Sequence, residues 1–424
     1  MKLWRTLLAL ALAGALGAYA YWGVYLGKEK KEKAEAEEKK LLDVEADPIV
    51  RVSIDKDGKV VTIARKDAGA PGEKKAEEEG ETPAPAKDEK WEVVEPLRAD
   101  ADDTQARVVT GAFKSLAREG KIEGADLALF GLDRPDLTVS VTTRGGKTET
   151  YAIGKKSPIG YKNYLRVGST GEVMLVGGSF RSSVDKDLAT LRDKRLFFFK
   201  RDDVRRIAVS QGGAETYALE QTDGKWTLAR PVEAKASSTE AGKILTALTG
   251  LRVEEFHAEE AGDLAEYGLD APRMAITVVS GESGTVETVS IGAESKHEHA
   301  YARRGDRPNV YAVKDKILVD LAKGADDLRE TKPVSARKWD VGRIELSGPD
   351  VKATLEKESS GEWTLASEAG TPRAEKKKVE DLLSALVDLK APGYVPGKPE
   401  DLAPLGLAEP WYTVTLSKVV RPFT

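Results

Sequence analysis

The chain has 424 residues, with 66 Lys and Arg against 71 Asp and Glu, a formal net charge of −5 and no cysteine. The absence of cysteine excludes disulfides, thiolate metal sites and a cysteine nucleophile. The small net charge argues against a nucleic-acid-binding protein, because such proteins concentrate basic residues on one face. At about 100–200 residues per domain, the length predicts two to four domains.

The N-terminal segment predicts a membrane anchor. Residues 6–26 form an uncharged, mostly apolar run after Lys2 and Arg5, and about 20 such residues cross a bilayer as a helix. Ala18-Tyr19-Ala20 has the small-x-small pattern of a signal-peptide cleavage site. Because the apolar run continues to Leu26, we favour an uncleaved signal anchor over cleavage.

The orientation of this anchor depends on two opposing signals. Lys2 and Arg5 favour a cytoplasmic N-terminus, whereas the lysines within residues 28–33 would keep the body in the cytoplasm by the positive-inside rule. A short basic region followed by an apolar run is the usual layout of an export signal. We therefore expect a single-pass protein of the bacterial inner membrane, with a cytoplasmic N-terminus and a periplasmic body.

An internal repeat of about 137 residues dominates the rest of the chain. Each copy contains one landmark tryptophan, and these residues, Trp91, Trp226 and Trp363, are 135 and 137 positions apart. Other landmarks recur at nearly the same offset: Gly131 and Pro135, Gly268 and Pro272, Gly406 and Pro410, with Ile153-Gly154 and Ile291-Gly292. Many landmarks at one offset indicate a tandem array of similar folding units.

The repeat sets the predicted domain organisation. The segments are an anchor (1–27), a charged helical stalk (28–46), repeat unit 1 (47–201), repeat unit 2 (202–338) and a partial repeat unit 3 (339–424). Residues 68–90 are an insertion rich in Ala, Glu, Lys, Gly and Pro, which we expect to be disordered. The third copy stops before an Ile-Gly or Tyr-x-Arg counterpart, which indicates either a truncated chain or a half unit.

Each unit is predicted to be α+β with an antiparallel sheet. In unit 2 the pattern first predicts strands at 206–210 and 216–221, a turn at Asp223-Gly224 and a helix capped by Ser237. It then predicts a helical turn ended by Gly268, strands at 274–279, 285–291, 300–304 and 309–313, and a helix around Ile317. Unit 1 repeats this order. Hairpin-linked strands with two or three helices disfavour a doubly wound nucleotide-binding fold.

Most of the repeated landmarks are predicted to be structural. A buried tryptophan anchors a core, and Gly-Leu-x-x-Pro ends a helix. Tyr164, Arg166, Tyr301 and Arg303 form the candidate ligand or partner face, because Tyr-x-Arg places both side chains on one face of a strand. Such a pair could bind a sugar or an anion by stacking and a guanidinium fork, although a cation–π or ion-pair role on the sheet is the commoner use.

No residue is predicted to be catalytic or to bind a metal or cofactor. His297-Glu298-His299 is the one metal-like stretch, but it lacks an identifiable third ligand. Asp100, Asp102 and Asp103 are expected to cap a helix rather than to act as acid and base. No phosphate-binding loop, dinucleotide fingerprint, nucleophile elbow or zincin helix occurs in the sequence, so we predict that the protein is not an enzyme.

These motifs in this order resemble a bacterial family, the domain of unknown function DUF4340. The resemblance rests on the anchor and on five short motifs: Trp-x-apolar-x-x-Pro at Trp91 and Trp226, Tyr267-Gly-Leu-Asp-x-Pro272, Ile291-Gly292, Tyr301-x-Arg303 and Leu191-Arg192-Asp193-Lys194. It implies an envelope protein, often encoded beside ABC-transporter components related to gliding-motility auxiliaries, with no established catalytic residues.

Three hypotheses of function follow. The first is a periplasmic binding or scaffolding protein, accessory to an ABC-type transport or gliding-motility-like system, with membrane transporter or envelope protein partners. The second is a cell-wall or polysaccharide-binding protein that uses the Tyr-x-Arg faces. The third is an unrecognised envelope hydrolase, which predicts an asymmetric polar cleft in only one copy.

Overall fold

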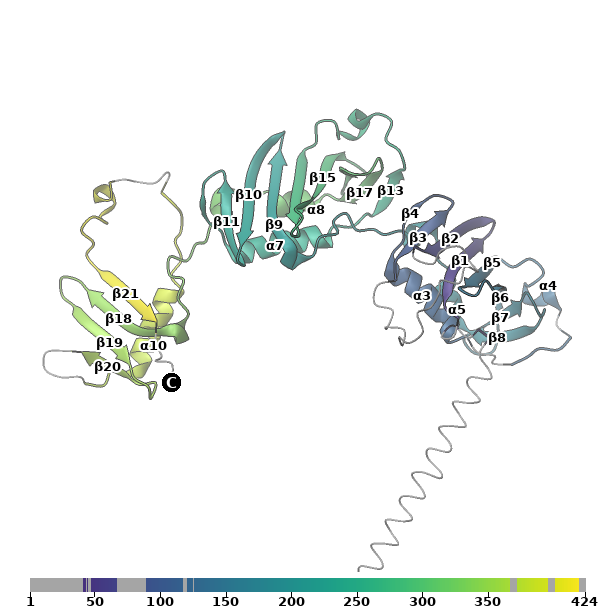
Figure 1. Ribbon diagram of the computed structural model, residues 1–424, viewed down its shortest axis with the longest axis horizontal. Helices are drawn as coiled ribbons and strands as arrows, with labels where there is room; N and C mark the ends of the chain where they lie inside the picture. The colour runs from purple at the N-terminus through teal and green to yellow at the C-terminus, as the bar shows by residue number, and fades with distance from the viewer. Residues whose placement is uncertain are drawn as a thin grey trace, which may run out of the picture. The chain divides into compact units, whose positions relative to one another are not determined.

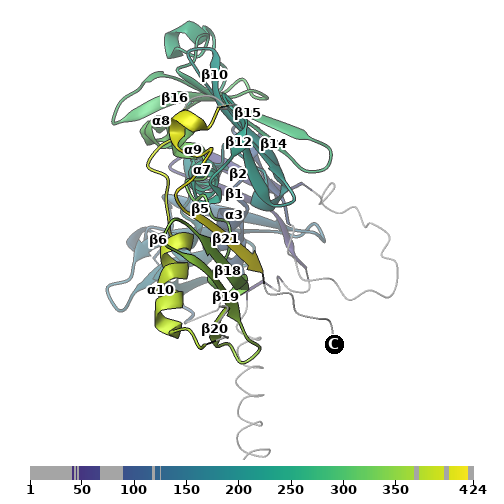
Figure 2. The same ribbon diagram turned by 90° about the vertical axis from the view of Figure 1, so that its left-hand side faces the viewer.

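The computed structural model describes residues 41–42, 44, 47–66, 89–116, 120–124, 126–366, 372–395 and 401–418. The chain divides into two compact units between Lys194 and Arg195, and each is described separately. Three antiparallel sheets with helices against them (Figures 1 and 2) confirm the predicted α+β class. Within the described ranges, no helix is both long and apolar enough to span a bilayer. The predicted anchor at residues 6–26 lies outside these ranges.

The first sheet contains eight strands. From edge to edge they are β4 (Ala99–Asp100), β3 (Trp91–Glu95), β2 (Lys59–Arg65), β1 (Ile49–Lys56), β5 (Leu137–Thr143), β6 (Thr148–Lys156), β7 (Lys162–Val167) and β8 (Val173–Gly177). Two four-strand meanders are therefore joined at their first strands, where Val52 of β1 lies opposite Val141 of β5. Within each meander, neighbouring strands are consecutive in the sequence. The two strands that pair at the join, β1 and β5, are not consecutive, because β2, β3 and β4 lie between them in the chain.

One face of the first sheet carries the hydrophobic core. Alternate residues of its strands are buried against α3 (Asp103–Lys114), α5 (Gly178–Val184) and α6 (Leu188–Leu191), as period-2 strands facing amphipathic helices require. Phe113 of α3 packs on Tyr151 and Phe180 with ring centroids 5.4 and 5.3 Å apart. Leu42 and Val44, within the predicted stalk, are buried in this core. Of the predicted insertion at 68–90, only Glu89 and Lys90 are described.

The second sheet repeats this architecture with nine strands. They are, in order, β12 (Ala234–Lys235), β11 (Lys225–Arg230), β10 (Ala214–Thr222), β9 (Val204–Gln211), β14 (Met274–Ser280), β15 (Thr285–Glu294), β16 (His299–Arg304), β17 (Val310–Lys314) and β13 (Glu255–Ala258). The central pairing of β9 with β14 corresponds to that of β1 with β5. The predicted strands of unit 2 are confirmed, whereas β12 and β13 carry no periodic pattern and were not predicted.

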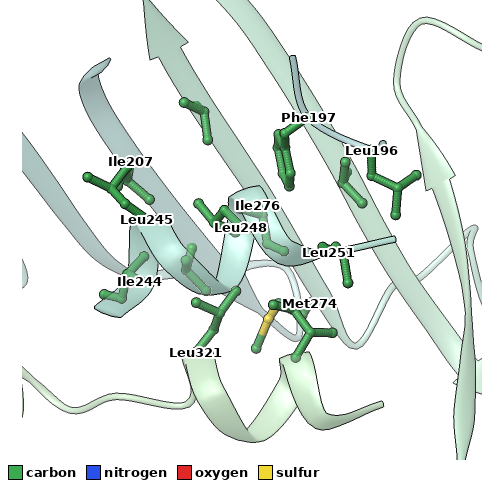
Figure 3. Close-up of a cluster of buried hydrophobic side chains, with 14 of the residues drawn as sticks. Leu196, Phe197, Ile207, Ile244, Leu245, Leu248, Leu251, Met274, Ile276 and Leu321 are labelled. Carbon is green, nitrogen blue, oxygen red and sulfur yellow. The ribbon is translucent and has the colours of Figure 1, made fainter. Parts of the chain in front are cut away.

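The second core lies between this sheet and helices α7 (Ser238–Gly250), α8 (Lys316–Leu321) and α9 (Ala325–Leu328). Figure 3 shows Ile244, Leu245 and Leu248 of α7 pointing toward Ile207 and Ile276 of the sheet. Ser237 caps α7 as predicted, because its hydroxyl accepts a hydrogen bond from the Glu240 amide at 3.4 Å. Segment 196–199 contributes Leu196 and Phe197 to this second core.

The third sheet contains four strands, β20 (Trp363–Ala366), β19 (Lys352–Lys357), β18 (Val341–Ser347) and β21 (Thr413–Lys418). Its pairing of β18 with β21 corresponds to β1 with β5 and to β9 with β14, although β21 is an edge strand of this smaller sheet. Helix α10 (Lys376–Val387) lies along one face (Figure 2) and buries Val379 and Leu383 there. The same strand order in three sheets is what the sequence repeat predicts.

Candidate functional site: the outer sheet faces and their surroundings

The Tyr-x-Arg residues lie on the sheet faces that point away from the two large cores. On β7 the buried residues are Asn163, Leu165 and Val167, so Tyr164 and Arg166 share the opposite, half-buried face. Tyr301 and Arg303 occupy the same positions on β16. The prediction that both side chains of each pair share one face of a strand is therefore confirmed.

In the first repeat, the outer face is a polar surface bordered by an aromatic pair. Tyr164 stacks on Phe130 of α4 (Leu127–Phe130), with ring centroids 4.2 Å apart and planes inclined by 28°. Arg166 lies opposite Ala152 on β6 and borders a hollow of about 540 Å³ together with Leu127. The Arg166 Nε atom is buried and has no hydrogen-bond partner among the described residues.

Hydroxyl pairs cover the neighbouring strands of this face. Ser140 and Thr150 are 2.9 Å apart across β5 and β6, and Thr142 and Thr148 are 3.0 Å apart on the same pair of strands. Cross-strand hydroxyl pairs of this kind stabilise a sheet while keeping its surface polar. The outer face therefore presents hydroxyls beside a half-buried guanidinium.

The second repeat presents a larger aromatic group at the matching position. Tyr301 lies 5.1 Å from Tyr267 and 4.9 Å from His257, measured between ring centroids, and all three contacts in the group are tilted or edge-on. His257, on β13, is exposed. Arg303 donates from Nε to the carbonyl oxygen of Arg307 at 3.1 Å. The structure thus assembles aromatic rings and an arginine on one face, as predicted from Tyr-x-Arg.

The aromatic partners were missed, although the repeat contained a signal for two of them. Phe130 and Tyr267 both directly precede the glycine of the Gly-Leu landmark, so an aromatic side chain occupies that position in both large repeats. The position of His257 depends on β13 pairing with β17, a contact across more than fifty residues. Nothing in the local sequence indicates that pairing.

The glycine–proline landmarks end short helices, as predicted. Gly131, Gly268 and Gly406 adopt left-handed backbone conformations, with φ of 67°, 61° and 67°, at the ends of α4, η3 (Leu264–Tyr267) and η5 (Ala403–Leu405). A residue with a side chain pays a steric cost in this region, whereas glycine does not. Pro135, Pro272 and Pro410 follow in the loops before the next strands.

The landmark tryptophans are buried core residues, also as predicted. Trp91, Trp226 and Trp363 are 1%, 5% and 2% exposed. In each copy the backbone carbonyl of the tryptophan accepts a hydrogen bond from the amide of an alanine about ten residues later in the chain. The distances are 3.2, 3.0 and 2.8 Å for Ala101, Ala236 and Ala374. Burial of the ring and this backbone contact give the residue a structural role.

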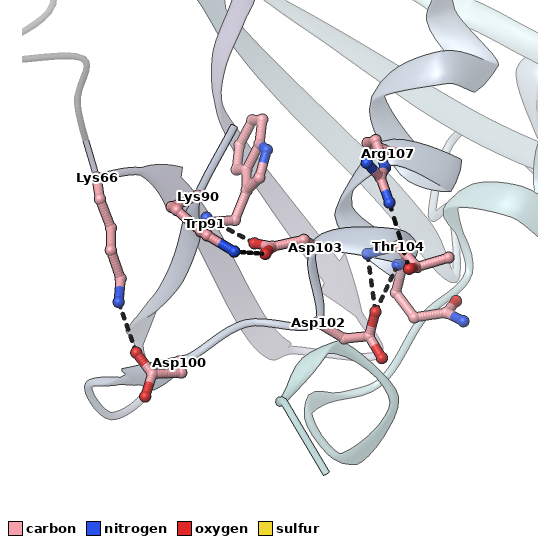
Figure 4. Close-up of polar contacts among 9 residues, drawn as sticks. Lys66, Lys90, Trp91, Asp100, Asp102, Asp103, Thr104 and Arg107 are labelled. Carbon is pink, nitrogen blue, oxygen red and sulfur yellow. Dashed lines mark hydrogen bonds and ion pairs between the residues drawn. The ribbon is translucent and has the colours of Figure 1, made fainter. Parts of the chain in front are cut away.

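The acidic cluster at the start of α3 contains the helix cap, Asp102 (Figure 4). Asp102 accepts hydrogen bonds from the amides of Thr104 and Gln105 at 2.8 and 3.1 Å. Asp103 accepts from the Trp91 amide at 3.0 Å and pairs with Lys90, while Asp100 pairs with Lys66. Asp102 therefore caps the helix as predicted, whereas Asp103 and Asp100 bind Trp91, Lys90 and Lys66, which lie outside the helix.

The second unit also contains a cleft of about 710 Å³ that the sequence did not indicate. Phe198 lies at its edge between two guanidinium groups, with ring-to-cation distances of 4.7 Å to Arg195 and 4.5 Å to Arg304. Burial by itself lowers the pKa of Arg304, but the hydrogen bond to Asp306 and the attraction of the Asp306 and Glu287 charges together outweigh this and raise it. The same bond holds the pKa of Asp306 below its usual value. The opposite charges of Arg304 and Asp306 therefore neutralise each other.

The His297–His299 stretch forms a turn rather than a strand. His297 and Glu298 have φ of 59° and 58°, and β16 begins only at His299. The two histidines therefore do not stand on one strand face. Among the residues that the structure describes, no group of three or more His, Asp or Glu side chains is arranged to hold a metal ion.

Comparison with known proteins identifies the family. The chain matches the family described as "Domain of unknown function (DUF4340)" over residues 91–257 and again over residues 226–410. The two matches begin at the landmark tryptophans Trp91 and Trp226. No curated protein and no solved structure matches the chain. Because the two matches together cover most of its length, the chain belongs to the DUF4340 family.

Proposed function

We propose that the protein is a membrane-anchored binding or scaffolding protein with a periplasmic body, accessory to an ABC-type transport or gliding-motility-like system. The apolar run at residues 6–26 supports the anchor. The resemblance to envelope proteins encoded beside such transporters supports the context. No residue in this proposal acts as a catalyst.

The duplicated outer face is the observation on which the proposal depends. Both large sheets keep an aromatic contact and a half-buried arginine on the face opposite the core, through Tyr164 and Arg166 in one repeat and Tyr301 and Arg303 in the other. Two similar faces on one chain can engage an extended or repeated partner with an avidity that neither achieves alone. An arginine beside aromatic rings is also a frequent anchor of protein interfaces.

Crosslinking in the native host followed by affinity purification of the full chain tests this proposal. We expect ABC-type membrane components among the crosslinked proteins, and we expect the double variant Arg166→Ala/Arg303→Ala to lose them. The matched control is Arg144→Ala/Arg205→Ala, which removes one exposed arginine from each repeat. Recovery of no transport component, or equal recovery with both double variants, would refute the proposal.

A fusion experiment tests the orientation separately. Alkaline phosphatase joined after Lys418 is active only when it reaches the periplasm, whereas a fluorescent protein at the same position reports a cytoplasmic location. We expect an active phosphatase. An inactive phosphatase together with a fluorescent counterpart would place the body in the cytoplasm.

A second candidate function, polysaccharide binding, is favoured by the aromatic group on the second sheet. His257 is exposed beside Tyr267 and Tyr301, and aromatic faces stack on the apolar faces of sugar rings. Sedimentation of the full chain with purified peptidoglycan tests this. Binding should fall in His257→Ala/Arg303→Ala and persist in the exposed-histidine control His297→Ala. Failure of the wild type to sediment would exclude this candidate.

A further inference from the structure

A cleft of about 650 Å³ in the first repeat, separate from the outer face, carries an excess of positive charge. Four cationic side chains line it, Arg134, Lys155, Lys156 and Arg181, against the two carboxylates Asp136 and Asp185. A volume of this size suits a small molecule or a headgroup.

The carboxylates in the cleft are already engaged. Arg181 forms an ion pair with Asp136, and Lys56 pairs with Asp185 at 2.7 Å. In contrast, no ion pair of Arg134 or Lys155 occurs within the described part of the chain. The cleft therefore keeps cationic groups that its own acidic residues do not neutralise.

The second repeat shows that the fold does not need these charges. The register of β6 with β7 pairs Lys156 with Asn163, and that of β15 with β16 pairs Glu294 with Ala300, which fixes the equivalence of the two copies. By this alignment Arg134, Lys155, Lys156 and Arg181 correspond to Ala271, Ala293, Glu294 and Leu318. The second repeat folds into the same strand order without a single one of these cations.

Two side chains that line the cleft, those of Lys155 and Tyr161, pack directly on glycine residues of its wall. The aliphatic stem of Lys155 packs on Gly131, and the ring of Tyr161 lies directly on Gly178, where a Cβ would collide with it. Tyr161 is 66% exposed, and the Lys156 ammonium lies 4.8 Å from its ring centroid. An exposed ring beside unpaired cations fits a ligand that has an anionic group and a less polar body.

We propose that this cleft binds a phosphate-bearing ligand, with Arg134 and Lys155 as its principal contacts. Phosphate matches these groups because its several oxygens accept charge-assisted hydrogen bonds from guanidinium and ammonium donors. Tyr161 contacts the organic part of the ligand. The source is either a soluble phosphorylated molecule or the headgroup of an anionic lipid, and both share this chemistry.

We assign ligand binding, and no hydrolysis, to this cleft. An asymmetric polar cleft in one copy is what the hydrolase hypothesis predicts, but a hydrolase also needs a free general base or nucleophile. Asp136 and Asp185 are both held in ion pairs. The cleft thus provides charge for binding and no unpaired carboxylate for catalysis.

Calorimetry on the full chain in phosphatidylcholine nanodiscs tests the proposal. One arm titrates glycerol 1-phosphate and inorganic pyrophosphate, and the other adds phosphatidylcholine vesicles with and without phosphatidylglycerol. The test variant is Arg134→Ala/Lys155→Ala. The control is Lys59→Ala/Arg144→Ala, which removes the same charge from exposed positions of the same repeat.

We expect the test variant to weaken binding by about tenfold or more, as the loss of charged hydrogen bonds implies, while the control variant binds like the wild type. A loss confined to the soluble ligands identifies a phosphorylated metabolite, and a loss confined to phosphatidylglycerol vesicles identifies a lipid headgroup. Equal affinity of the two double variants in both arms, or no binding by the wild type, would overturn the proposal. Unchanged thermal unfolding of both variants verifies that the fold is intact.

Discussion

Gly292 lies directly against the carbonyl oxygen of Tyr267, and a Cβ on this glycine would collide with that oxygen. Gly154 has the same relationship to Phe130 in the first repeat. This close contact links the Ile-Gly landmark to the Gly-Leu landmark. The glycine of Ile-Gly must lack a side chain because the backbone of the Gly-Leu loop passes directly over it. The contact also sets the position of the aromatic residue that contacts the Tyr-x-Arg tyrosine.

Substitution of Gly292 by alanine should destabilise the second unit. The added methyl group must displace backbone rather than a flexible side chain, so we expect a loss of about 1–3 kcal/mol, typical of overpacking. Urea unfolding of the full chain, followed by circular dichroism, measures the effect. Gly250→Ala is the control, since nothing lies within 4 Å of the added Cβ there. A neutral Gly292→Ala would show that the loop yields easily.

The turn at His297-Glu298 should be improvable. Two other hairpin turns with positive φ use Asp-Gly, at Asp57-Gly58 and Asp223-Gly224. Glu298 has φ of 58°, a conformation in which a side chain has a steric cost that glycine avoids. We therefore expect His297→Asp/Glu298→Gly to raise the free energy of unfolding by about 0.5–1 kcal/mol. Thermal unfolding of the double variant and the wild type provides the comparison. A lower unfolding temperature would contradict the turn geometry.

Removal of the cap on α3 should weaken the first unit. Asp102 accepts two amide hydrogen bonds at the helix start, so Asp102→Ala is expected to cost about 0.5–2 kcal/mol. Asp102→Asn keeps an accepting oxygen and should recover most of this loss. Denaturant titration of the three proteins checks the order. If alanine and asparagine were equivalent, the cap would contribute nothing.

The stability of the first unit should depend on Glu149 in a defined pH range. Burial by itself raises the pKa of this carboxyl, but hydrogen bonds from Ser169 and Thr150 outweigh it and hold the pKa below the usual 4.5. The folded state therefore binds the proton less readily than the unfolded state. Its stabilisation is complete above pH 4.5 and disappears as the pH falls through the lower, folded pKa.

The variant Glu149→Gln makes this dependence measurable. At neutral pH it should unfold at lower denaturant concentration than the wild type, by about 1–3 kcal/mol for lost hydrogen bonds to a charged group. The difference should shrink as the solution is acidified below the carboxyl range. Glu123→Gln, at an exposed position, should show no such convergence. A constant difference at all pH values would disprove the role of ionisation.

Local pattern was sufficient for much of the fold. The Asp223-Gly224 turn, the Ser237 cap and the left-handed Gly268 depend on interactions within a few residues, so residue type and spacing predict them directly. The alternation of buried and exposed residues placed Tyr164 and Arg166 on one face for the same reason. The offset of the tryptophans predicted the repeat before any contact was known.

Contacts between distant residues decided the rest. The pairing of β1 with β5 brings Val52 opposite Val141, and the sequence between them does not say which strands become neighbours. The position of His257 beside Tyr301 likewise follows from a long-range strand pair. The grouping of Arg134, Lys155 and Arg181 around one cleft needs three separate elements to meet. Sequence periodicity determines which face a residue occupies, whereas the tertiary structure alone determines what that residue meets there.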